Sequence, residues 1–402
     1  MNQKLGKRRK RELRKRLPGP NSQTPVSLNE ISHYLPFDRH PEIENDLIRA
    51  RMAGPILTEQ DLADSPSEGI LAQAASACIE FAKRAMNVTQ DIYIAIVRTN
   101  ARNALAIGRD NLNCIVISSG YIFDLSILIQ NLDRTVSFRE LWENPHGPPK
   151  PVSIVPTRSR AEAIEFLLTT YSPVDDFPRN VSLMSFCTEF IVFHELGHII
   201  NGHTRNGIFR TGSIKEIASL RDPDLLLTVR ALELDADAFA VQHTMWWMFL
   251  RVGRDGLAKP LVADHQTALI SVLTCMMVTI ISMDVDRNQI AGEYQYSSHP
   301  PAYVRSWGVM AAAAVHLADW QTKVDFISPD WEIIVHNVRI GIEVAISIAG
   351  NSGFDTKTHE QWMAIIVEHD TKSLARWAKI RPALELNKFG THKLAPAQVA
   401  PE

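Results

Sequence analysis

Cysteine is scarce in this chain, with four residues in 402. No two cysteines form a C-x-x-C pair, and each has apolar neighbours: Cys78, Cys114, Cys187 and Cys275. This pattern favours neither a thiolate zinc site nor a disulfide framework. We expect four reduced, buried thiols in a reducing compartment, which places the protein in the cytoplasm.

The chain also lacks a long apolar run and a strong overall charge. Its longest apolar stretch, residues 268–283, is about 16 residues long and contains serines and threonines, whereas a membrane span needs roughly 20 residues. We therefore expect a buried core helix there and no membrane span. The net charge of −3 predicts no strongly acidic or basic partner for the body of the protein.

Charge is concentrated in one place, the basic segment Lys4–Arg16. A Pro/Gly-rich stretch follows it, so it lacks the apolar region of a secretory signal. We expect residues 1–27 to be a disordered arm. The arm either aids solubility or contacts nucleic acid, an acidic protein or an anionic surface. Nothing in the sequence indicates an oligomeric state.

The remaining pattern is mostly helical and predicts an α+β fold. Three short β-branched runs interrupt the helical segments, and we expect them to form a small antiparallel sheet: 91–97, 104–107 and 113–118. Helical periodicity is found before and after them: 70–86, 181–203, 222–249, 268–283, 302–318, 331–349 and 360–383.

The expected domain organisation follows from these patterns and from length. Residues 28–350 form the main domain, with a Pro-rich surface loop at 140–160. Residues 351–386 form a C-terminal helical segment. Residues 387–402 look like a flexible tail.

The stretch Ile191–Ile200 contains the pattern H-E-x-x-H in an apolar frame. His194 and His198 are four residues apart and share one face of a helix, where two neutral imidazoles can hold one Zn²⁺ ion per chain. Glu195 follows the first histidine and can accept a proton from a zinc-activated water.

A catalytic zinc site needs a third protein ligand, either a histidine or a carboxylate. The metzincin pattern would place a histidine at residue 204, which is Thr204, and a glycine at residue 201, which is Asn201. His203 is one position away, so we expect it to be a loop or rim residue.

Glu233 fits as a carboxylate ligand, 35 residues after His198 and in an apolar helical frame. Asp237 lies on the same helical face at i+4 and can accept the free N–H of a ligand histidine. Asp235 points elsewhere and is expected to be a solvated or capping acid.

Three motifs together resemble the HtpX-like and CAAX prenyl protease type 1 family of gluzincin metallopeptidases. The motifs are Phe193–His198, Glu233–Ala240, and Ser298–Pro301 with Arg305. The resemblance covers roughly residues 85–310, which would be the core of a zincin-like domain with its sheet packed on the H-E-x-x-H helix. A second resemblance, resting on fewer residues, is to Lit-type phage-exclusion peptidases, which cut one host protein.

The resemblance implies a role for each matching residue. Glu233 would be the third zinc ligand, and Asp237 would support a ligand histidine. His299 would stabilise the tetrahedral oxyanion with Arg305 nearby. Family members bind peptide substrate along the edge of their second strand, which matches the strand near residue 104.

We therefore expect a zinc-dependent endopeptidase, with a protein or peptide as substrate and Glu195 as general base. The alternative is a regulatory or binding protein that acts through its basic arm and whose zinc site is structural or vestigial.

Overall fold

The computed structural model describes eleven stretches of the chain: 33–35, 43–109, 112–133, 141, 177–205, 222–253, 261–284, 300, 302–323, 330–349 and 359–395. Several expectations lie outside these residues. They are the basic arm, the Pro-rich loop apart from Leu141, and His299.

A three-stranded sheet forms where the sequence predicts one, but its strands are not all antiparallel. The strands are β1 (Tyr93–Val97), β2 (Ala104–Arg109) and β3 (Leu112–Ser118), in the order β1-β3-β2. Strand β3 pairs antiparallel with β2 and parallel with β1. The expected antiparallel sheet is therefore wrong, and the sheet is mixed. Consecutive strands do reverse direction, but β3 lies between β1 and β2 and therefore runs parallel to β1. The pattern within each strand does not encode this order in the sheet.

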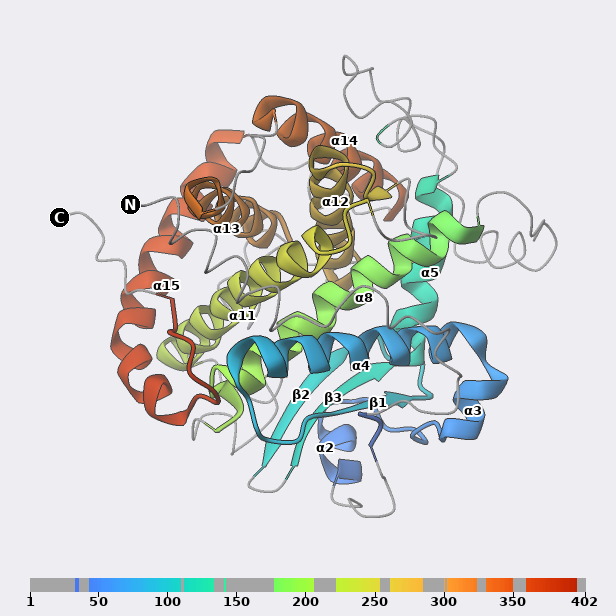
Figure 1. Cartoon of the computed structure of the whole chain (residues 1–402). Coiled ribbons are helices and arrows are strands. Elements are labelled where there is room, and N and C mark those ends of the chain that lie inside the picture. Colours follow the sequence, from blue (N-terminus) through green and yellow to red (C-terminus); the bar gives the residue numbers. More distant parts are fainter. Residues whose placement is uncertain are drawn as a thin grey trace, which may run out of the picture.

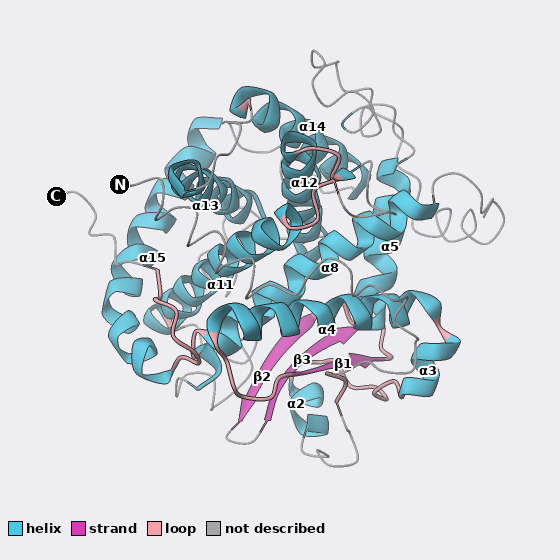
Figure 2. Ribbon diagram, in the orientation of Figure 1, coloured by secondary structure: helices cyan, strands magenta, loops and turns pink. Residues whose placement is uncertain are grey.

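Both faces of this sheet are covered, which explains why β3 is buried along its whole length. Ile94, Ile96 and Ile115 face the main core. On the opposite face, Ala95 and Val116 pack in a smaller core with residues of the N-terminal helix α2. Figure 2 shows the sheet between α4 and α2.

Helices make up most of the described fold (Figure 1). Their bounds in chain order are α2 (Ile43–Arg49), α3 (Glu59–Asp64), α4 (Pro66–Met86), α5 (Ser119–Asp133), α8 (Phe177–Ile200), α11 (Pro223–Phe249), α12 (His265–Asp284), α13 (Ala302–Lys323), α14 (Trp331–Ala349) and α15 (His359–Asn387). The predicted α+β class is confirmed, since the rest of the described architecture is the small mixed sheet.

Helices α8 and α11 cross the centre of the molecule next to each other and pack more extensively than any other pair of described helices (Figure 1). Asp222 caps α11, because its carboxylate accepts the N–H groups of Asp224 and Leu225, and Pro223 occupies the first turn. Helix α8 ends at Ile200, and the chain turns through Gly202, whose φ of +80° suits only glycine.

Among the described residues, two helices are long and apolar enough to cross a membrane, Arg179–Ile200 within α8 and His265–Met283 within α12. In each, 89% of the apolar window is buried inside the fold. Core helices share this length and composition with membrane spans, and burial of this extent agrees with the core helix expected at residues 268–283.

The C-terminal segment does not begin to fray at residue 387 as predicted. Residues 388–395 lie against the body, with Phe389 2% exposed and Leu394 3% exposed. The Phe389 N–H donates to the Ile200 carbonyl at 2.7 Å, which satisfies one of the open acceptors at the end of α8. The burial of these two apolar side chains and the hydrogen bond to Ile200 stabilise this segment against the body. The polar composition that suggested a flexible tail does not reveal these contacts.

Helix α15, expected as a separate segment, belongs to the same fold. Its residues Trp377 and Leu384 form a buried cluster with Ala231 and Leu232 of α11. Figure 1 shows α15 along the outer side of α11.

His243 of α11 makes stability depend on pH. Its ring stacks on Phe239 with centroids 4.0 Å apart, and its Nδ1–H donates to the Phe239 carbonyl at 2.8 Å. Burial lowers the pKa of His243 from 6.5 to about 4. Between these pH values His243 is protonated in the unfolded chain but neutral in the folded chain.

We therefore expect His243 to remove about 3 kcal/mol of folding free energy as pH falls from 6.5 to 4. In His243→Phe this part of the pH dependence disappears, because phenylalanine does not titrate. Urea unfolding of both proteins across this range measures the difference. Parallel stability curves for wild type and variant would contradict the expectation.

Candidate metal centre

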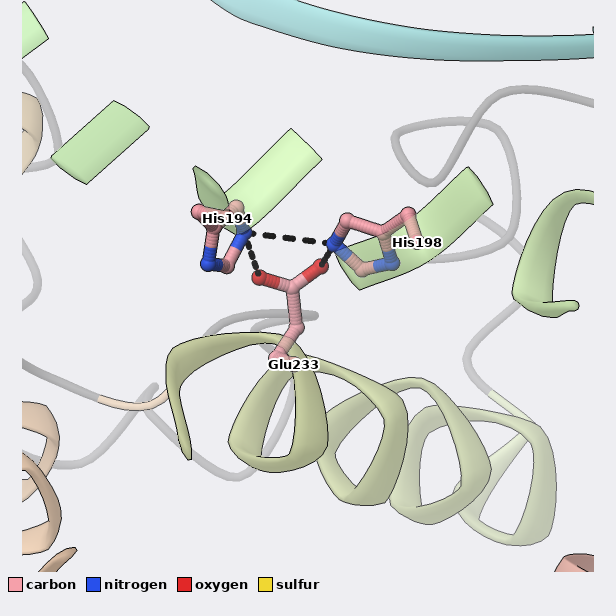
Figure 3. Close-up of side chains that lie close together, drawn as sticks. All are labelled: His194, His198 and Glu233. Carbon is pink, nitrogen blue, oxygen red and sulfur yellow. Dashed lines mark hydrogen bonds and ion pairs between the residues drawn. The ribbon is translucent and has the colours of Figure 1, made fainter. Parts of the chain in front are cut away.

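Three side chains from α8 and α11 converge on one point, as the sequence predicts (Figure 3). His194 Nε2 lies 3.2 Å from His198 Nε2. Each nitrogen lies 3.4 Å from a different carboxylate oxygen of Glu233. All three side chains are buried, with exposed fractions of 4%, 4% and 1%.

The spacing of these donor atoms fits a tetrahedral metal ion. Ligand atoms about 2.0–2.1 Å from a tetrahedral zinc ion lie about 3.3–3.4 Å apart. The 3.2 Å between the two imidazole nitrogens matches this edge length, and Glu233 presents a different carboxylate oxygen 3.4 Å from each nitrogen. Two imidazoles and one carboxylate also form the donor set of known catalytic zinc sites, which keep a fourth position open. The residues present therefore fit zinc.

The backbone of α8 brings the two halves of the site together. Gly197 lies between the ligand histidines and faces Ala236 of α11. A Cβ atom on Gly197 would meet the Ala236 Cα at 3.1 Å and the Phe239 side chain at 3.2 Å. Because the helices approach so closely, the short side chain of Glu233 can place its carboxylate between the two imidazoles.

A carboxylate fixes the orientation of the first ligand, as predicted. His194 Nδ1 lies 2.8 Å from Asp237 Oδ1. Arg305 holds the same carboxylate with two hydrogen bonds, from Nε at 2.9 Å and Nη2 at 2.7 Å. This arrangement keeps Nε2 of His194 directed at the metal position.

The pKa values of this group show a site that favours positive charge. Burial alone would lower the pKa of His194, but the charges and hydrogen bonds of Asp237 and Glu233 outweigh it and raise the pKa to about 10. Burial would raise the pKa of Asp237, but Arg305 and His194 lower it to about 2. Two carboxylates thus hold a cationic charge at His194, and the same field suits a metal cation.

Arg305 has other contacts than the resemblance implies. It is 3% exposed, and its Nε and Nη2 both bind Asp237, so it lies one side chain away from the metal donors. We interpret it as a positioning residue and not as a group that contacts substrate. His299 is outside the described residues, so its oxyanion role stays a prediction, although Pro300 and α13 follow it in the expected place.

Glu195 lies on α8 between the two ligand histidines and is 6% exposed. Burial raises its pKa, while the neighbouring His194 and His198 lower it less. A carboxylate with a raised pKa next to a metal position is suited to accept and return a proton near neutral pH.

His203 and Asp235 are the residues that sequence reasoning missed. The prediction carried the helix on to His203 and expected a rim residue, but the turn at Gly202 folds it back until no part of it is exposed. Its Nδ1 lies 3.0 Å from His198 Nδ1, and its Nε2 lies 3.0 Å from Asp235 Oδ2. Asp235, expected in solvent, is 7% exposed. The Asn201–Gly202 pair was the available signal, because these residues favour a helix end. Beyond that end, the helical periodicity no longer determines which way the His203 side chain points.

Comparison with known proteins gives no further information, because no family model, curated protein or solved structure matches this chain. The description of the site therefore rests on its own geometry.

Replacement of Glu233 by glutamine tests the donor set. The amide keeps the size of the side chain but removes the anionic ligand. We expect zinc affinity to fall by more than about 100-fold, because loss of residues that only support ligands already costs about 10–100-fold. Competition with a chromogenic chelator measures this affinity. Glu332→Gln, at an exposed acid of α14, is the control and should bind zinc like wild type. Equal affinity of both variants would remove Glu233 from the site.

A pair of matched variants tests the role of Arg305. Arg305→Met leaves the buried charge of Asp237 without its guanidinium, and we expect it to lower the free energy of unfolding by about 3–5 kcal/mol. Arg109→Met breaks a similar bidentate pair with Asp46, but Arg109 is 42% exposed, so the expected loss is at most about 1 kcal/mol. Urea unfolding compares the two, and equal losses would contradict the positioning role.

Proposed function

We infer that this protein is a zinc-dependent endopeptidase. The observation that carries the proposal is the convergence of His194, His198 and Glu233, whose donor atoms lie within 4.8 Å of one another, with the buried acid Glu195 beside them. A zinc ion in such a site polarises a carbonyl group and lowers the pKa of a water molecule.

The residues around the site have three roles: metal binding, orientation of a ligand and proton transfer. His194, His198 and Glu233 hold the ion, and Asp237 with Arg305 keeps His194 in the required orientation. Glu195 takes the proton that the attacking water loses and passes it to the leaving amine. The low exposure of these side chains limits access of bulk water, which strengthens each electrostatic interaction.

The position of β2 supports a peptide substrate. Strand β2 is an edge of the sheet, and among the described residues it pairs only with β3. It packs beside α8 and the short turn His203–Arg205, so its outer edge runs near the site. An extended peptide can add to such an edge through backbone hydrogen bonds, which suits cleavage of unfolded or loop segments.

The proposal includes a reducing, cytoplasmic location, in line with the four cysteines, all of which are buried free thiols. The substrate range is open: the enzyme cleaves many proteins or, as in Lit-type peptidases, one host protein. The experiment below distinguishes these two outcomes. The regulatory alternative, in which zinc serves only structure, predicts zinc binding without cleavage.

Glu195→Gln separates these possibilities. We expect the variant to bind zinc like wild type and to cleave at least about 100-fold more slowly, because general bases typically contribute 10²–10⁴-fold. Wild type and variant are incubated with a whole-cell protein extract, and new N-termini are labelled and identified by mass spectrometry.

Glu332→Gln, at the exposed acid of α14, serves as control and should produce the wild-type set of N-termini. Equal cleavage by Glu195→Gln would show that the mechanism is wrong. Bound zinc with no new N-termini from wild type would favour the regulatory alternative.

A further inference from the structure

His198 has a support that differs from that of His194. Nδ1 of His194 lies beside the Asp237 carboxylate, whereas Nδ1 of His198 lies beside a second imidazole, that of His203, whose Nε2 lies beside Asp235. The three members of this second arrangement, His198, His203 and Asp235, are 4%, 0% and 7% exposed. Nothing in the H-E-x-x-H or E-x-x-x-D patterns requires it.

Only one arrangement of protons satisfies these contacts when His198 binds metal. A neutral imidazole that offers Nε2 to a metal carries its proton on Nδ1. Nδ1 of His198 therefore donates to Nδ1 of His203, which must accept. His203 then carries its own proton on Nε2 and donates it to Asp235 Oδ2.

The same order continues to the C-terminal segment. Asp235 Oδ2 also accepts from Asn201 Nδ2 at 2.6 Å, which fixes the orientation of that amide. Asn201 Oδ1 then accepts from His392 Nε2 at 2.9 Å. Two series of hydrogen bonds thus end at the Asp235 carboxylate, one from His198 through His203 and one from His392 through Asn201.

We propose that His203 and Asp235 are positioning residues of the metal centre, which fix the tautomer and the ring orientation of His198, and that Asn201 and His392 hold the far end of this relay. The inference rests on the metal centre of the proposed function.

The relay is tested by zinc affinity, measured by competition with a chromogenic chelator. His203→Phe keeps a planar ring but removes both hydrogen bonds, and we expect a loss of about 10–100-fold. Asp235→Asn keeps the shape and an acceptor oxygen but removes the charge, so a smaller loss is expected. His243→Phe is the matched control, since His243 is also a buried histidine but lies outside the relay, and its zinc affinity should equal that of wild type.

The tautomer of His203 is a second readout. A purely structural role for His203 would not require one particular tautomer. In zinc-loaded wild type with ¹⁵N-labelled histidine, NMR should show His203 neutral with its proton on Nε2. A proton on Nδ1, or on both nitrogens, would overturn the relay.

The affinities separate this inference from the centre itself. Zinc bound by wild type and equally by folded His203→Phe would overturn the relay and leave the centre intact. If His203→Phe does not fold, Asp235→Asn decides in the same way. No zinc bound by wild type would overturn both.

Discussion

The metal donors can meet only because helices α8 and α11 pack at a very short distance. Gly197 removes the side chain that would separate them, and Ala236 presents the smallest one on the other side. Glu233 lies one turn before Ala236 and therefore reaches the space between two histidines on successive turns of α8. The sheet, α4 and the outer helices hold this crossing in place, since α8 is buried along almost its entire length.

The free-energy cost of burying charge explains why so many paired ionisable side chains surround the contact between α8 and α11. Four buried acids, one arginine and three histidines lie within or next to the donor set: Glu195, Glu233, Asp235, Asp237, Arg305, His194, His198 and His203. Buried charges are costly unless each is paired and hydrogen-bonded. One guanidinium compensates one carboxylate, and a divalent cation would compensate two more. This charge balance is in line with the proposed metal centre.

Local patterns predicted the parts of the fold that depend on local physics. The spacing of His194 and His198 on a helix and the three β-branched runs that form the strands follow from helical and extended geometry. The direction of β1 and the burial of Phe389 depend on contacts between distant segments, which periodicity does not encode. His203 shows the difference within one motif, because a helix that ends three residues earlier changes a rim residue into a buried partner of His198.

The contact between Asn201 and His392 joins residues 191 positions apart in the chain. During synthesis the H-E-x-x-H helix leaves the ribosome long before the segment that completes its surroundings. At about 5–20 residues per second, the ribosome needs roughly 10–40 s to make the intervening chain. For that interval the nascent protein has its histidine pair but not the segment that holds the turn beside it. The order of the sequence thus delays maturation of the site until most of the protein has been made.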